Sequence, residues 1–145
     1  MFNDLLAVRR RTLAAGHPNL SNVLVSLGGM KLDQKRYAEA EPLLREALDG
    51  QLKTGADTWR RYYTESLLGA CLVGLGKYAE AEPILLAGYK GVLARQNTMP
   101  FENREMVDEV RESVGRLHKE WGRPAPPISV DHQQARPQVG SGYRG

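Results

Sequence analysis

Two nearly identical segments constrain the fold of this chain more than any other feature. RYAEAEPLLREAL begins at Arg36, and KYAEAEPILLAGY begins at Lys77, 41 positions further along. When the sequence is aligned with itself at this offset, the residues YAEAEP are identical in both copies. Chance does not produce such a match in a chain of 145 residues. A fixed period in this range predicts stacked copies of one supersecondary unit.

Apolar residues within each copy recur at intervals of three and four, the spacing that puts side chains on one face of a helix. In the first copy the pattern is interrupted at DQKR, and in the second it is interrupted at Gly76. Glycine suits a helix end because it adopts the left-handed conformation without steric cost. Lys35 stands at the equivalent position of the first copy. Each copy is therefore predicted to be a helix, a tight turn and a second helix.

Each predicted second helix contains a proline, Pro42 in one copy and Pro83 in the other. Proline removes a backbone donor and crowds the carbonyl group four residues back. Both prolines fall about one turn into the helix, close to N–H groups that have no partner within the helix. We therefore expect each proline to cost at most one hydrogen bond.

Small residues recur at matching places in the two copies and predict where two antiparallel helices approach closely. A glycine inside a helix costs about 1 kcal/mol relative to alanine, so two at equivalent positions indicate that a larger side chain does not fit. The matching positions are Gly28 and Gly69, Ala40 and Ala81, and Ala47 and Gly88.

The period predicts an all-α solenoid of antiparallel helical hairpins. Valines, Leu117 and Trp121 near the C-terminus form one apolar stripe, which predicts a closing helix. The residues after this stripe are rich in Pro, Gly, Gln and Arg and show no apolar period, which predicts a disordered tail. The expected segments are a leading helix left from a preceding repeat (1–16), two repeat units (17–56 and 57–98), a capping helix (99–122) and a disordered tail (123–145).

Composition and charge exclude several classes of protein. The net charge of +3 is too small to indicate nucleic-acid binding by itself. Cys71 is the single cysteine, which excludes an intramolecular disulfide and fits a reducing compartment. No stretch has the length and apolarity of a membrane span, and the first residues lack the pattern of a signal peptide. We expect a cytoplasmic protein.

Candidate catalytic and metal-binding residues do not form a recognisable site. His17, His118 and His132 have no second ligand at metal spacing, and His118 is expected on the surface. Cys71 lies on the apolar face and is expected to be buried rather than reactive. No nucleophile, acid–base pair or cofactor loop can be assembled, so we expect no catalytic residues, no metal and no cofactor.

The two copies resemble tetratricopeptide repeats, in the longer variety of about 42 residues that occurs in kinesin light chains and many bacterial proteins. The resemblance rests on the YAEAEPLLREAL helix and on the HPN linker at 17–19, and it covers residues 17–95. The C-terminal half also resembles the end of the repeat arrays appended to bacterial serine/threonine kinases. Val25 and Ser26, then Ser66 and Leu67, replace the paired asparagine of the family.

The resemblance implies a non-catalytic protein–protein interaction module, acting as an adaptor, a scaffold or a regulatory segment. In the family, the first helices line a concave groove that holds a peptide or a partner helix. Two arginines of the closing helix are expected to add charge at the end of the groove. The candidate groove residues are Asn22, Ser26, Gly29, Tyr63, Ser66, Ala70, Arg104 and Arg111.

Two other functions remain open at this point. The chain could be the detached C-terminal part of a larger multidomain enzyme such as a bacterial kinase. It could also be an RNA-binding helical repeat, because the cluster WRRYY at 59–63 and the arginines at 9–11 combine basic with aromatic side chains. Self-association through the N-terminal helix is a further possibility, and no membrane partner is expected.

Overall fold

The computed structural model describes residue 7 and the ranges 18–55 and 57–122. In these ranges it contains α-helices and two short 3-10 helices, and no strand. The elements are α2 (Pro18–Asp33), α3 (Tyr37–Lys53), α4 (Trp59–Gly74), α5 (Tyr78–Ala94), η1 (Gln96–Thr98), η2 (Phe101–Asn103) and α6 (Glu105–Trp121). Apart from residue 7, the expected leading helix at 1–16 lies outside the described residues, as does the expected tail at 123–145.

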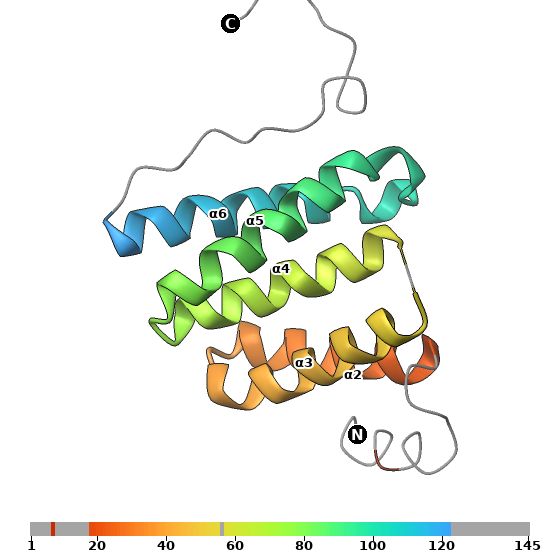
Figure 1. Ribbon diagram of the computed structural model, residues 1–145, viewed down its shortest axis with the longest axis horizontal. Helices are drawn as coiled ribbons and strands as arrows, with labels where there is room; N and C mark the ends of the chain where they lie inside the picture. The colour runs from red at the N-terminus through yellow and green to blue at the C-terminus, as the bar shows by residue number, and fades with distance from the viewer. Residues whose placement is uncertain (1–6, 8–17, 56, 123–145) are drawn as a thin grey trace, which may run out of the picture.

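The helix bounds repeat with the period of the sequence. α4 (59–74) begins and ends 41 residues after α2 (18–33), and α5 (78–94) begins and ends 41 residues after α3 (37–53). In each pair a short turn reverses the chain, so the two helices run antiparallel (Figure 1). The predicted all-α repeat of helical hairpins is confirmed.

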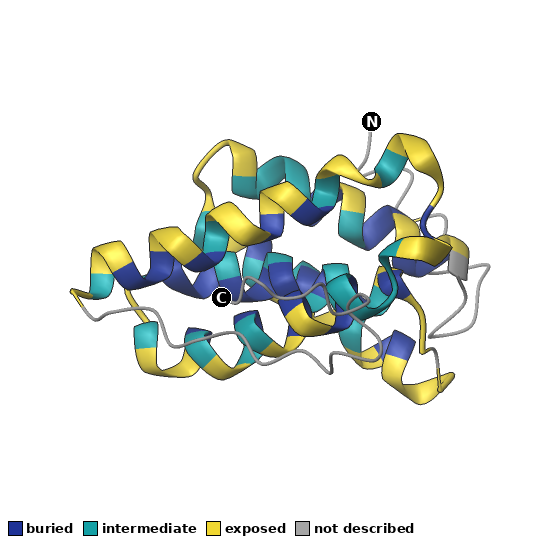
Figure 2. Cartoon of the chain, turned by 90° about the horizontal axis from the view of Figure 1, so that it is seen from above, coloured by how far each residue is buried: buried dark blue, intermediate teal, exposed yellow. Residues whose placement is uncertain are grey.

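The hairpins stack so that every helix packs against the next, and α4 also contacts both α2 and α6. A third unit in register would begin at residue 100 (59 + 41), but α6 begins at Glu105 after the two 3-10 turns. α6 nevertheless packs against α4 and α5, where the first helix of a third hairpin would lie. Figure 2 shows that the buried faces of the helices turn inward and the exposed faces turn outward.

The two hairpin turns have the same geometry although their sequences differ. Lys35 and Gly76 both adopt the left-handed conformation, with φ of 61° and 78°. In each turn the next residue donates a hydrogen bond back into the first helix, from Arg36 N to Lys31 O at 2.8 Å and from Lys77 N to Leu72 O at 2.9 Å. Both residues thus close a helix C-terminus in the same way, but Lys35 carries a Cβ that the left-handed region disfavours.

The predicted close approach of the paired helices is confirmed. A Cβ atom on Gly69 would lie 2.9 Å from the Leu85 Cα, and one on Gly28 would lie 2.7 Å from the Leu44 Cδ2. Ala40, Ala47 and Ala81 are fully buried. Because the Gly69 contact involves the Leu85 backbone rather than a side-chain tip, a Cβ at this position could be accommodated only by a shift of α5 itself.

Both prolines lie on the exposed side of their helices, and the helices continue through them. Pro42 has no N–H group to donate to the carbonyl of Ala38, four residues back. Ala38 is itself exposed, so water can solvate that carbonyl. Pro83 and Ala79 form the same arrangement in the second hairpin.

The apolar stripe of the closing helix α6 packs against the rest of the fold. Val107, Val110, Val114 and Leu117 are buried, and the ring of Trp121 stacks on Tyr78 with centroids 6.1 Å apart. The ring thus joins the end of α6 to the start of α5.

The expectation that His118 lies on the surface is wrong. His118 is buried, and its Nδ1 and Nε2 atoms lie 3.0 Å from the Val114 carbonyl oxygen and 3.0 Å from Glu82 Oε2. It follows Leu117 at the edge of the apolar stripe, and that edge faces α5. Both partners are hydrogen-bond acceptors, and each ring nitrogen lies within hydrogen-bonding distance of one of them.

Cys71 lies in the largest apolar cluster, as predicted. Its side chain is fully buried, and its Sγ–H donates to the Tyr37 carbonyl oxygen at 3.0 Å. Burial, reinforced by the charge of Glu41, raises the pKa of the Cys71 thiol to about 11. The thiolate, which is the reactive form, is therefore scarce in the folded protein.

Lys35→Gly is expected to raise the free energy of unfolding by about 0.5–1 kcal/mol, because it relieves left-handed strain at a modest entropic cost. Gly76→Lys, the matched change in the second turn, is expected to lower it by about 1 kcal/mol. Urea denaturation followed by circular dichroism measures both values. Shifts of the same sign for the two variants would contradict the equivalence of the turns.

Gly69→Ala is expected to lower the free energy of unfolding by about 1–3 kcal/mol, since the added methyl group meets the Leu85 backbone. Gly115→Ala is the control, because nothing lies within 4 Å of a Cβ at that exposed position of α6. The control is expected to raise the free energy of unfolding by about 0.5–1 kcal/mol through helix propensity. Thermal melts of both variants test the difference, and a stabilised Gly69→Ala would disprove the tight contact.

Dithionitrobenzoate should modify Cys71 at least about 100-fold more slowly in the native protein than in urea-unfolded protein at about pH 8. The raised thiol pKa and the burial of the sulfur both slow the reaction. Absorbance of the released thiolate measures the two rates. Similar rates in the two states would show that the thiol is accessible in the fold.

Candidate binding groove along the first helices

A groove with a volume of about 790 Å³ crosses α2, α4 and α6. Residues of these three helices form most of its lining, with Tyr37 and Gln51 of α3 and Asn103 of η2 at its margins. The three helices are brought side by side because α2 and α6 both pack against α4. The groove is therefore a product of hairpin stacking rather than of any one hairpin.

Most of the residues predicted for the groove line it. On α2 these are Asn22, Ser26 and Gly29, and on α4 they are Tyr63 and Ala70. Their spacings of three, four and seven residues keep them on one face of their helices. Asn22 and Ser26 are exposed, while the others are partly buried in the floor.

The structure places the other three predicted residues on different surfaces. Ser66 is buried against Gly88 of α5, and its hydroxyl donates to the Tyr62 carbonyl oxygen at 2.9 Å. Arg111 Nε donates to the Tyr89 hydroxyl at 2.9 Å, on the side of α6 that turns toward α5. Arg104 precedes α6, is exposed, and is not part of the lining.

Apart from Arg60, which belongs to the cluster at 59–63 considered for RNA binding, the charged residues of the groove are ones for which no binding role was predicted. Asp33 of α2 and Glu109 and Glu112 of α6 contribute carboxylates, and Arg60 and Arg116 contribute guanidinium groups. Glu109, Glu112 and Arg116 are spaced by three and four residues, opposite the apolar stripe of α6. That spacing is visible in the sequence, but it does not reveal that this face of α6 lines a groove together with α4 and α2.

Tyr63 occupies a central position on the α4 side of the groove. Its hydroxyl donates to Glu109 Oε1 at 2.8 Å, which ties α4 to α6. Burial, this hydrogen bond and the charges of Glu109 and Asp33 together raise the pKa of the Tyr63 phenol well above its ordinary value. Tyr63 therefore remains a neutral hydrogen-bond donor.

Two further contacts define the polar character of the groove. Arg116 Nη2 donates to the Tyr37 hydroxyl at 3.3 Å, and its Nε donates to Glu120 Oε2 at 2.8 Å, so this cation already has an acidic partner. Gln51 is about nine-tenths buried, and its Oε1 atom has no hydrogen-bond partner. A buried acceptor of this kind favours a ligand that brings a donor.

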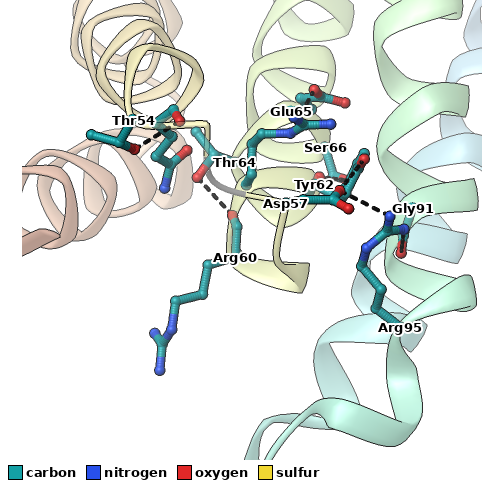
Figure 3. A network of polar contacts seen from close by, with 11 residues as sticks. Thr54, Asp57, Arg60, Tyr62, Thr64, Glu65, Ser66, Gly91 and Arg95 are labelled. Carbon is teal, nitrogen blue, oxygen red and sulfur yellow. Dashed lines mark hydrogen bonds and ion pairs between the residues drawn. The ribbon is translucent and has the colours of Figure 1, made fainter. Parts of the chain in front are cut away.

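The basic and aromatic cluster at 59–63 is used mainly inside the fold. The Tyr62 ring lies between the guanidinium groups of Arg61 and Arg95, at 4.2 and 4.3 Å from its centroid. Asp57 accepts hydrogen bonds from the Tyr62 hydroxyl at 2.8 Å and from Arg95 at 2.9 Å (Figure 3), and these bonds hold its pKa below the ordinary value. Trp59 is buried in an apolar cluster. Tyr62 and Trp59 are thus engaged in contacts within the fold, whereas Arg60 and Tyr63 of the same cluster line the groove.

Two further properties of the described residues bear on partners. Among them, no three histidine, cysteine, aspartate or glutamate side chains come close enough together to hold a metal ion. None of the helices in the described ranges is both long and apolar enough to cross a membrane.

Comparison with known proteins gives one family match. A family model described as tetratricopeptide repeat matches residues 21–54, which include most of α2 and all of α3. No curated protein matches the chain. The second hairpin repeats the bounds of the first at an interval of 41 residues. In its sequence over residues 21–54, and in its repeated helical hairpins, the chain is similar to tetratricopeptide repeat proteins.

Proposed function

We propose that this protein is a non-catalytic protein–protein interaction module whose groove across α2, α4 and α6 binds an extended peptide or a partner helix. The groove itself carries the proposal, because three successive first helices line one continuous hollow of about 790 Å³. Ligand sites in proteins commonly have volumes of roughly 300–1,000 Å³.

The composition of the groove suits a peptide. Half-buried Val25, Leu67 and Met106 offer apolar contacts. The small residues Ser26 and Gly29 leave room above α2, because nothing lies within 4 Å of a Cβ placed on Gly29. An apolar floor with polar groups at its margin is the usual composition of a protein interface.

We further infer that the repeats are of the longer, kinesin-light-chain-like variety and that the chain corresponds to the C-terminal end of a bacterial array in the cytoplasm. The 41-residue interval between equivalent helices supports the first point. The outward face of α6 is charged and includes Glu105, Asp108 and Lys119, which supports its role as a closing helix. An adaptor or regulatory role follows from the resemblance.

Protein binding is favoured over RNA binding by the contacts of the 59–63 cluster. A base would have to displace Arg61 or Arg95 to stack on Tyr62. The groove also carries three carboxylates against two guanidinium groups, which repels a polyanion.

Panning a phage library of random peptides against the protein tests the proposed function. Ser26→Trp should fill the groove and reduce the recovery of selected peptides at least about 10-fold, since a large side chain replaces an exposed hydroxymethyl group in the lining. Ala87→Trp is the matched control, because Ala87 is exposed on α5 outside the groove.

Circular dichroism must show the same helicity for both variants and the unchanged chain. Peptides that bind all three proteins equally well would place recognition outside this groove.

A further inference from the structure

The charge of the groove is opposite to the net charge of the chain. The chain carries +3, but three carboxylates and two guanidinium groups line the groove. Of the two cations, Arg116 is paired with Glu120, and the Arg60 guanidinium lies 4.7 Å from the centroid of the Trp59 ring. The positive charge of the groove is thus largely engaged by the protein itself.

The three carboxylates, by contrast, have no cationic partner among the described residues. Glu109 accepts a hydrogen bond from Tyr63, but no lysine, arginine or histidine of the described ranges pairs with it. The same holds for Asp33 and Glu112, although the chain forms many other ion pairs. In a chain with an excess of basic residues, this leaves one concave surface with uncompensated negative charge.

The carboxylates act on one region of the groove. Glu109 of α6 accepts the hydrogen bond of the Tyr63 hydroxyl at 2.8 Å, and Asp33 lines the same groove from α2. The charges of both carboxylates help to raise the pKa of the Tyr63 phenol. Glu112 lies three residues, or almost one helical turn, after Glu109. Among the described residues, no three acidic, histidine or cysteine side chains lie close enough together to hold a metal ion, so these three carboxylates do not form a metal site. An organic cation, unlike a metal ion, needs no such close cluster of ligands.

A second observation, independent of the acidic residues, points to a donor-rich ligand. The buried Gln51 side chain lines the same groove, and its Oε1 atom has no hydrogen-bond partner. The buried Gln51 Oε1 atom is thus a neutral acceptor in the same groove as the three carboxylates. Arginine offers five N–H donors and a delocalised charge that stacks on aromatic rings, so it fits such a surface better than any other side chain.

We propose that the partner of this groove is an extended peptide that presents an arginine, whose guanidinium group lies beside Tyr63 between Asp33 of α2 and Glu109 and Glu112 of α6. The main chain of the peptide crosses the apolar floor and supplies a donor to Gln51. This inference rests on the proposed function and specifies the chemistry of its ligand.

A peptide recovered by panning and then synthesised in two forms tests the proposal. One form contains the selected arginine, and the other contains citrulline, a neutral side chain of nearly the same shape. Fluorescence anisotropy should show about 10-fold weaker binding of the citrulline form to the unchanged protein, because the charge-assisted contacts are lost. The affinity of the arginine form should also fall as salt is added.

Glu109→Gln and Glu112→Gln are each expected to weaken binding of the arginine peptide by about 3- to 10-fold. Each change should also reduce the difference in affinity between the arginine and citrulline peptides, because interacting groups are coupled in a double-mutant cycle. The amide at position 109 can still accept the Tyr63 hydrogen bond, so the fold is retained. Asp108→Asn, an exposed change on the same helix at a residue that pairs with Arg111 and does not line the groove, should alter neither affinity.

The outcomes separate this inference from the function on which it rests. Peptides that bind in the groove without an arginine, or with equal affinity in the citrulline form, would overturn the inference and leave the binding function intact. Equal affinity after replacement of the arginine by lysine would overturn the assignment of a guanidinium group. If every peptide binds the Ser26→Trp variant as tightly as the unchanged protein, both proposals are contradicted.

Discussion

A continuous apolar seam joins α3, α4, α5 and α6, and every other feature of the structure depends on it. Leu44 of α3, Leu68 and Leu72 of α4, Leu85 of α5 and Leu117 of α6 all belong to one buried cluster. Stacked hairpins contact only their neighbours, so this cluster and two smaller ones, on α2 and α3 and around Trp59, hold them together. The seam also sets the distance between α2, α4 and α6, and the groove exists because that distance is maintained.

The helices can share this seam only because small residues let them approach. Gly69 meets the backbone of Leu85, and Gly88 meets the hydroxyl and backbone of Ser66. These contacts explain why Ser66 is buried between α4 and α5 although it stands close in sequence to the groove residues. His118 is also buried between two helices, because its ring on α6 lies within hydrogen-bonding distance of Glu82 on α5.

The faces of individual helices could be predicted from the sequence with little more than the helical period. Asn22, Ser26 and Gly29 share one face of α2 in the structure, as their spacing requires. Ser66 and Arg111 lie elsewhere, because a period describes one helix at a time and does not state which neighbour each face meets. Arg111 is bonded to Tyr89 of α5. Without the position of α5, no spacing rule separates such a residue from one in the groove.

The sequence alone determined the repeat, its interval and its helical character, because local hydrogen bonding and apolar spacing are properties of short segments. It also placed the left-handed turn at Gly76 and the buried thiol at Cys71. Only the tertiary structure decided that Asp33, Glu109 and Glu112 line one concave surface. These residues come from two helices that are far apart in the chain, and the packing of both against α4 brings them together.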